Sequence, residues 1–230
     1  HSRELLAGLT DIDLSAEAFP YLGAREGTFA SADSLMMRVG FVGELGYEIH
    51  MAAADLRIAV DRIMDTGKNF DIRPFGVEAQ RLLRLEKGHI IVGQDTDGLT
   101  NPYEAAMPWA IHAKKDNFVG KRSLQILKKK KIRTLVGFTL ASGKGETLPD
   151  ECNLVIDGGE ICGRVTSVSE SPTLSCVIGM AYVDDKTLLR GGNICIRTND
   201  GVLVEAKVAP FPFYDPKGLR QTFRPAGVSG

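Results

Sequence analysis

The sequence has no long apolar run and no excess charge of one sign, and each absence excludes a class of protein. No apolar stretch reaches the ~18 residues that a membrane-spanning helix needs. Lys and Arg number 28 against 29 Asp and Glu, so the chain lacks the basic field of a general nucleic-acid or membrane-surface binder. The first residues lack the apolar core of a signal peptide. We therefore expect no nucleic-acid partner and no membrane partner.

Metal and dinucleotide motifs are also missing. The four cysteines form no C-x-x-C pair and have no histidine at metal-ligand spacing. All four lie in apolar, strand-like runs, which favours buried, reduced thiols in a cytoplasmic protein over disulfides. The segment Asp95-Thr-Asp-Gly98 begins like a calcium loop, but the later ligand positions are absent, so we predict a turn and no metal. No G-x-G-x-x-G or G-x-S-x-G motif is present, so nothing specifies a dinucleotide site or hydrolysis.

The pattern of the sequence changes near residue 130. The 230 residues have room for one large domain or two smaller ones, and 25 glycines indicate many turns. After residue 131 the apolar residues alternate with period two, and Asn199-Asp-Gly201 is a strong hairpin signal between 194–198 and 202–208. We predict an α+β fold in which a mixed domain, 1–130, precedes a small antiparallel β-barrel, 131–230.

Strands and helices alternate in the first half. Two strands, 34–41 and 45–51, are expected around a tight connection at Val42-Gly-Glu44. A helix over 53–66 is expected to end at Gly67. Its apolar stripe comprises Leu56, Val60, Ile63 and Met64. A second helix follows Pro74 and ends at Gly88, and a third covers 120–129 and ends in the solvated lysines 128–131.

The second strand of this hairpin carries a candidate ligand-binding carboxylate. Strand alternation puts Leu45, Tyr47, Ile49 and Met51 on one face, and Glu48 and His50 on the other. Glu48 is either a solvated rim charge or a ligand group. An ionised carboxylate accepts two adjacent donors in bidentate fashion, and the amide N–H and amino group of a pterin form such a pair.

Several motifs, in the same order, give the chain a family resemblance. Segments 41–49, 76–88, 93–98, 116–124 and 163–174 resemble the aminomethyltransferase (glycine cleavage T-protein) superfamily. Segments 9–20, 86–98 and 212–216 are most similar to the C-terminal region of sarcosine oxidase alpha subunits. The resemblance implies a folate-binding α/β-sandwich domain, incomplete here, followed by the barrel.

The resemblance implies tetrahydrofolate-dependent one-carbon transfer that yields 5,10-methylenetetrahydrofolate. In the sarcosine oxidase branch, flavin and NAD, where present, belong to other regions or subunits of a flavin-containing amine oxidase, which would be this chain's partners. The alternatives are an aminomethyltransferase of the glycine cleavage system and a non-catalytic folate-binding module. Lys87-Gly-His89 disfavours the module, because its iron–sulfur assembly relatives carry Cys where this chain has His89.

The resemblance also assigns folate-binding residues by position. Glu48 matches the glutamate that holds the pterin edge, and Phe41 falls at a folate-contacting aromatic. Tyr47 is a lining residue or part of the core, with the core favoured. Gln80 stands where T-proteins have a substrate-contacting Arg, and Tyr214 is a candidate contact for the outer part of folate.

One expected residue has no counterpart. The family has a catalytic acid in an N-terminal segment that no part of this chain matches, so neither Asp11 nor Asp13 takes that role. We therefore expect the chain to be a C-terminal fragment of an enzyme of the sarcosine oxidase or aminomethyltransferase type. Arg81 or Arg84 is expected either to compensate for Gln80 or to lie on the surface.

Overall fold

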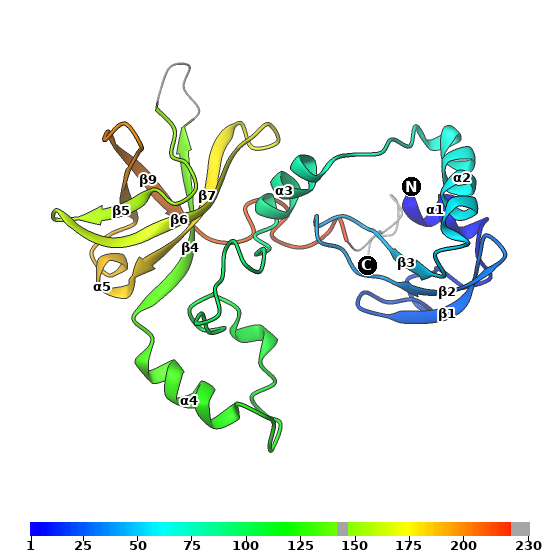
Figure 1. The fold of residues 1–230 in the computed structure, drawn as a ribbon, viewed down its shortest axis with the longest axis horizontal. Coiled ribbons are helices and arrows are strands. Elements are labelled where there is room, and N and C mark those ends of the chain that lie inside the picture. Colours follow the sequence, from blue (N-terminus) through cyan, green and yellow to red (C-terminus); the bar gives the residue numbers. More distant parts are fainter. Residues whose placement is uncertain (142–146, 222–230) are drawn as a thin grey trace. The chain divides into compact units, whose positions relative to one another are not determined.

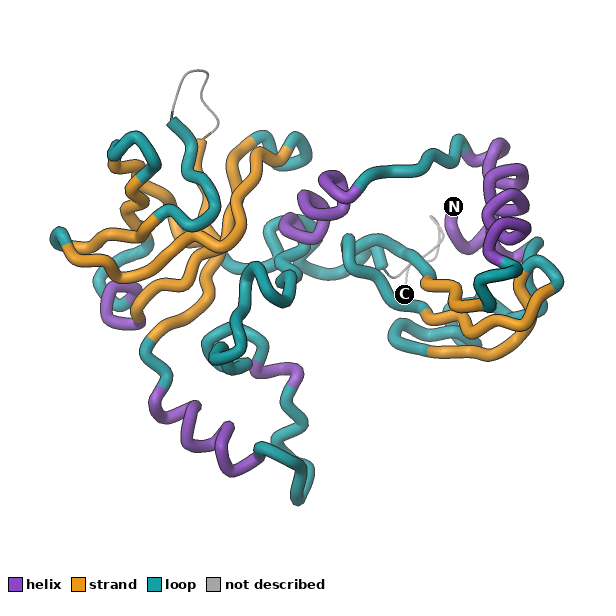
Figure 2. Tube along the Cα trace, in the orientation of Figure 1, coloured by secondary structure: helices purple, strands orange, loops and turns teal. Residues whose placement is uncertain are grey.

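The computed structural model describes residues 1–141 and 147–221. It divides into two compact units, which are considered separately below (Figures 1 and 2). Unit 1 contains residues 1–83 together with the C-terminal residues from 217, and unit 2 contains residues 84–216. None of the helices in the described part of the chain is long and apolar enough to cross a membrane.

Unit 1 is built on a three-stranded antiparallel sheet of order β1-β2-β3. Its strands are β1 (Ala24–Phe29), β2 (Ala32–Met37) and β3 (Glu48–Met51). Its helices are α1 (Ser2–Ala7), α2 (Leu56–Gly67), the 3-10 helix η1 (Lys68–Phe70) and the first part of α3 (Val77–Glu86). The core joins one face of the sheet to α1 and α2 through Leu5, Leu6, Phe29, Met36 and Ala59. The other face of the sheet carries the polar side chains considered below.

Unit 2 contains a closed barrel in which every strand pair is antiparallel. In barrel order the strands are β4 (Arg133–Ala141), β7 (Cys176–Asp184), β6 (Glu160–Ser171), β5 (Leu154–Asp157), β8 (Asn193–Arg197) and β9 (Leu203–Ala209). The remaining elements are η2 (Pro108–Ala110), α4 (Lys121–Lys130) and α5 (Asp185–Leu188). Phe138, Val155, Val165 and Ile196 are fully buried inside the barrel. This interior is the largest apolar core of the unit.

The predicted fold class is confirmed, and the barrel forms where the period-two pattern begins. The predicted β8–β9 hairpin is also confirmed: the Thr198 N–H donates to the Val202 carbonyl at 2.9 Å, and Gly201 has a φ of 84°. Residues 84–130 belong to the same compact unit as the barrel, whereas the predicted domain boundary lies at 130. That boundary stays a prediction.

The prediction for the α2 helix needs two corrections. Leu56 and Val60 are exposed, and the buried side of the helix is formed by Ala59 with Ile63 beside it. Gly67 is the last residue of α2 rather than a stop beyond it: it keeps a helical φ of −67°, and the chain continues as η1 until Asp71 adopts a φ of 51°. Gly67 is needed for close packing instead, since a Cβ there would lie 2.2 Å from Cγ2 of Ile72.

The predicted tight turn between β2 and β3 is wrong, because a loop over 38–47 joins the two strands. Arg38, at its start, is buried and donates to the carbonyls of Phe19 (2.8 Å) and Gln221 (3.0 Å). The Leu45 N–H donates to the Arg220 carbonyl at 3.0 Å. Bonds to residues distant in the sequence therefore shape this loop, and the local pattern contains no trace of them.

The cysteines are free thiols in the described chain, but one prediction about them fails. Cys162, Cys176 and Cys195 lie in strands, and burial raises the pKa of each thiol. Cys152 is exposed and lies in a turn with a φ of 69°. The apolar residues that follow Cys152 form β5, which begins two positions later at Leu154.

The four lysines at the end of α4 are not equivalent. Lys128, Lys129 and Lys130 are exposed, as predicted, whereas Lys131 binds Asp185 in the helix that follows β7, with its Nζ 2.8 Å from Oδ2. Burial opposes ionisation of Asp185. The hydrogen bonds from Lys131 and Thr134 outweigh burial and lower the pKa of this carboxyl below its ordinary value of 3.8.

Asp185→Asn is expected to lower the free energy of unfolding at neutral pH by about 1 kcal/mol. Because the folded-state pKa is depressed, the contribution of Asp185 is present above the unfolded pKa of about 4 and is lost as pH falls through the folded value. Urea denaturation at neutral pH and near pH 2 checks this. Asp184→Asn, at an exposed neighbour, is the control. If Asp185→Asn lowered the free energy of unfolding equally at both pH values, the result would contradict a stabilising role for the ionised Asp185 carboxylate.

Candidate functional site

Glu48 lies on the face of the unit 1 sheet that points away from α1 and α2. It is opposite Met37 in the β2–β3 register, and His50 is opposite Leu35. The Glu48 side chain is 57% exposed, and its Oε2 lies 3.4 Å from Nε2 of His50. Ile49 packs against the core on the other face. The predicted alternation is confirmed here, and it leaves the Glu48 carboxylate accessible for binding.

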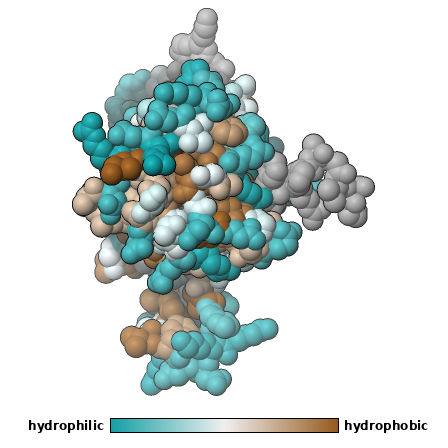
Figure 3. All heavy atoms as spheres, turned by 90° about the vertical axis from the view of Figure 1, so that its right-hand side faces the viewer, coloured by the Kyte–Doolittle hydropathy of each residue, from teal (hydrophilic) through white to brown (hydrophobic). Residues whose placement is uncertain are grey.

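A hollow of about 640 Å³ lies on this exposed face. Its lining consists of Glu26, Gly27, Thr28, Asp33, Ser34, Leu35 and His50. Leu35 pairs with Glu26 on one side and with His50 on the other, so an apolar side chain lies between polar ones. A lining that mixes an apolar side chain with polar ones suits a ligand with both polar edges and an apolar body. Figure 3 shows the side of the molecule that lies at the right in Figure 1, where hydrophobic residues lie among hydrophilic ones.

The two predicted aromatic residues differ in their surroundings. Phe41 is half-buried in the loop between β2 and β3. The Tyr47 ring packs against Phe19 with 5.7 Å between centroids, and its hydroxyl accepts a bond from Arg3 Nε at 3.4 Å. Tyr47 also joins the unit 1 core, on the face opposite Glu48. These contacts support the core interpretation of Tyr47.

Gln80 lies on α3 and is exposed. Its neighbour Arg81 is about one-third exposed and pairs with Glu78 at 3.4 Å. Tyr214, the remaining candidate, belongs to unit 2, where its N–H donates to the Glu86 carbonyl at 2.9 Å. Glu48, Phe41, Tyr47 and Gln80 thus share unit 1, and Tyr214 does not.

The suggestion that Arg84 compensates for Gln80 or lies on the surface is wrong. Its side chain is 2% exposed, and Nη1 donates to Oδ2 of the fully buried Asp95 at 2.5 Å. Nη2 donates to the Ser167 hydroxyl at 2.7 Å. Asp95 also accepts bonds from the Thr166 and Ser167 hydroxyls, both at 2.6 Å, and from the Ile91 N–H at 2.8 Å. The sequence analysis did not predict this network. Its one sequence signal is Asp95, the first acidic residue between Gly93 and Gly98.

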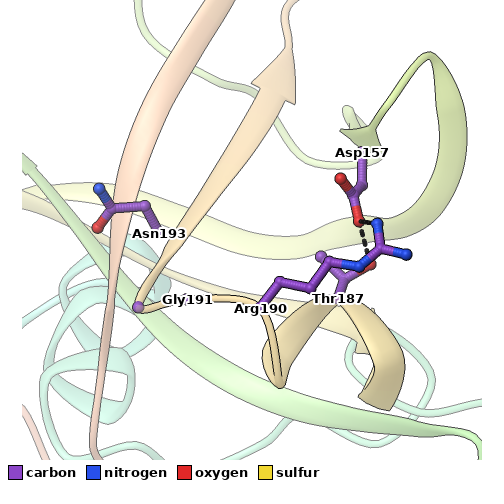
Figure 4. Close-up of a pocket in the computed structure, with 6 residues that line it drawn as sticks. Asp157, Thr187, Arg190, Gly191 and Asn193 are labelled. Carbon is purple, nitrogen blue, oxygen red and sulfur yellow. Dashed lines mark hydrogen bonds and ion pairs between the residues drawn. The ribbon is translucent and has the colours of Figure 1, made fainter.

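A second hollow, of about 330 Å³, lies on unit 2 (Figure 4). It is lined by Asp157, Thr187, Arg190, Gly191, Gly192 and Asn193. In the close-up, Asp157 points toward Arg190 and Thr187, and its Oδ2 accepts from Arg190 at 2.8 Å and from Thr187 at 3.0 Å. The two charges of the lining neutralise each other, so we place no ligand here. Across residues 1–141 and 147–221, no group of three His, Cys, Asp or Glu side chains is arranged to hold a metal ion.

Two stretches of the chain match the models of one family. Residues 1–115 match the GCVT N-terminal domain, and residues 133–215 match the glycine cleavage T-protein C-terminal barrel domain. The chain belongs to the glycine cleavage T-protein family. The crystal structure of the glycine cleavage system aminomethyltransferase T from Bartonella henselae has the same fold, with a TM-score of 0.75 at 23% identity. That match covers 93% of this chain and 57% of the other.

Curated relatives from the family carry two different names. An aminomethyltransferase from Halothermothrix orenii is 34% identical over 93% of this chain and 58% of its own length. A sarcosine oxidase subunit alpha from a Corynebacterium species (strain P-1) is 36% identical over 96% of this chain and 24% of its own length. The chain thus spans little more than half of the first of these relatives and about a quarter of the second.

Proposed function

We propose that this chain binds tetrahydrofolate through Glu48 and serves one-carbon transfer that yields 5,10-methylenetetrahydrofolate, as the resemblance to sarcosine oxidase alpha implies. The observation that carries the proposal is the accessible Glu48 carboxylate, within a family motif and on the same sheet face as the hollow. The residues present fit a pterin, because both carboxylate oxygens are on an exposed side chain and an apolar side chain, Leu35, lies on the same face.

The physical role of such a site is to hold folate in place. A carboxylate that accepts two parallel N–H bonds fixes both the position and the rotation of a planar heterocycle. Bound folate then presents its nitrogens to a one-carbon unit produced elsewhere, and fixed geometry removes much of the entropic barrier of a bimolecular capture. Phe41, in the loop before β3, is proposed to stack on the pterin ring or to form one wall of its site.

The partners proposed for this chain are the flavin-bearing regions or subunits of an amine oxidase. Gln80, exposed on α3, stands where T-proteins have a substrate-contacting Arg, which favours the sarcosine oxidase branch. The alternative is an aminomethyltransferase of the glycine cleavage system, and the H. orenii relative of that name supports it. Both functions require folate, so the same binding experiment tests their shared part.

Glu48→Ala is expected to weaken binding of folinic acid to the 230-residue chain by at least about tenfold, because a hydrogen bond to a charged group contributes about 1.5–3 kcal/mol. Isothermal titration calorimetry measures this directly. Glu44→Ala is the matched control, since Glu44 is a comparably exposed carboxylate, 47% exposed, in the preceding loop. Equal affinity in the wild type and Glu48→Ala would overturn the pterin assignment. Absence of binding to the wild type would remove the proposal for this chain.

A further inference from the structure

We propose that α4 docks an acidic segment of a partner protein, an inference that is independent of folate binding. The docking surface is the outward side of the helix, formed by the exposed residues Arg122, Ile126, Lys129 and Lys130. Ile126 follows Arg122 by four positions and precedes Lys129 by three, and these spacings bring side chains together on one face of an α-helix. No residue of α4 is buried, and Ile126 is 47% exposed. The described chain therefore leaves this side of the helix uncovered.

The charge around α4 is of one sign. Residues 114–131 contain eight of the chain's 28 Lys and Arg residues but only one, Asp116, of its 29 Asp and Glu residues. Lys131 pairs with Asp185, but within the described residues no carboxylate pairs with the three cations of the outward side. The helix dipole favours cations in the last turn, whereas Arg122 lies in the first turn, where the dipole disfavours a cation. These unpaired cations point to a partner of opposite charge.

The other side of α4 favours a protein partner over a lipid surface. Leu124 is half-buried, and the Nζ of Lys128, four positions later, lies 5.6 Å from the centroid of the Tyr103 ring. This side of the helix therefore faces the chain itself. A helix that lies in a membrane surface turns a wide apolar face toward the lipid, whereas the outward side has Ile126 alone among three cations. α4 also contains no aromatic residue on which a nucleobase would stack.

An acidic protein segment complements the outward side in two ways. Its carboxylates accept charge-assisted hydrogen bonds from the three cations, and the guanidinium of Arg122 holds a carboxylate in bidentate fashion. An apolar side chain between these carboxylates packs on Ile126, since protein interfaces combine an apolar centre with a polar rim. Because exposed charge pairs are screened by salt, the affinity should fall as the salt concentration rises.

The test titrates the 230-residue chain into a fluorescein-labelled synthetic peptide of Glu, Ala and Leu, in which Glu residues flank each Leu, and follows fluorescence anisotropy. The outward variant replaces all three cations by glutamine: Arg122→Gln, Lys129→Gln and Lys130→Gln. It is expected to bind the peptide about tenfold more weakly, the combined effect of three exposed ion pairs. Glutamine has a helix propensity close to that of Lys and Arg, so α4 should persist, which far-UV circular dichroism checks. The barrel variant is the matched control, since it removes three exposed cations from β6, β8 and β9: Arg164→Gln, Arg197→Gln and Lys207→Gln. It should bind like the wild type.

Ile126→Ala tests the apolar part of the surface. It is expected to weaken binding of the peptide about three- to tenfold and to leave binding of polyglutamate, which has no apolar side chain, unchanged. The proposal would be overturned if the wild type did not bind the peptide, or if the outward and barrel variants lost affinity equally. Tighter binding of vesicles of phosphatidylcholine and phosphatidylserine, or of a single-stranded oligonucleotide, than of the peptide would also overturn it. Folinic acid binding should be the same in the outward variant and the wild type, so this test and that of the proposed function fail separately.

Discussion

Asp95→Ala is expected to lower the free energy of unfolding of unit 2 by about 3–5 kcal/mol, the loss found when one partner of a buried ion pair is removed. The variant leaves the Arg84 guanidinium, 2% exposed, without a counter-charge. It also leaves the buried hydroxyls of Thr166 and Ser167 without the acceptor they share. Urea denaturation followed by far-UV circular dichroism measures the loss, with the transition of unit 2 treated separately from that of unit 1.

The neighbouring carboxylate provides the control for this prediction. Asp97 lies two positions further along the same turn, is exposed, and accepts bonds from Leu99 and Thr100 within the loop. Asp97→Ala is expected to cost about 1 kcal/mol. Replacing both members of the buried pair, as in Arg84→Met with Asp95→Leu, should recover part of the loss. A deficit for Asp95→Ala no larger than that for Asp97→Ala would show that the network is not a main source of stability.

Phe138→Ala is expected to destabilise the barrel by about 3–5 kcal/mol, because it removes a fully buried ring and leaves a cavity. Phe138 lies on β4 directly opposite Gly179 of β7. Its ring covers the glycine so closely that a Cβ at position 179 would lie 2.2 Å from Cζ of Phe138. The same denaturation experiment measures the effect.

A double-mutant cycle tests whether this pair acts as a unit. Gly179→Ala alone is expected to cost about 1–3 kcal/mol, because the ring has to leave its position. In the Phe138→Ala background the added methyl enters the vacated space, so its cost should fall to near zero or become a gain. Gly191→Ala is the control, since a Cβ at position 191 meets no atom within 4 Å. Additive effects of the two substitutions would contradict direct packing of ring on glycine.

The barrel was predictable because its signals are local. Alternation with period two marks strands whose inner residues form the core, and Asn199-Asp-Gly201 specifies its hairpin without help from the rest of the chain. In unit 1, β1 was not predicted, because Ala24-Arg-Glu-Gly-Thr-Phe29 has no apolar alternation and is defined mainly by pairing with β2. Local pattern identifies elements with their own hydrophobic signature and misses those that depend on a partner.

The candidate site was predictable to the same degree. Alternation predicts that Glu48 and His50 share the exposed face, but only their side-chain conformations bring the carboxylate and the imidazole to 3.4 Å. The opposite error concerns Arg84, which lies on a helix of polar character yet is buried by Asp95 and Ser167. The burial of Arg84 could not be predicted from its place in the sequence. It depends on hydrogen bonds to residues 11 and 83 positions away.

Unit 1 is discontinuous along the chain, and this has a consequence for its biosynthesis. Two residues of the loop between β2 and β3 form hydrogen bonds to the end of the described chain: the Leu45 N–H donates to the Arg220 carbonyl, and the Arg38 guanidinium donates to the Gln221 carbonyl. The whole of unit 2 lies between these partners in the sequence. During translation, all residues of the barrel are therefore synthesised before the residues that form these last contacts of unit 1. The bond from the Arg38 guanidinium, which is buried in the folded unit, to the Gln221 carbonyl can therefore form only after translation reaches Gln221.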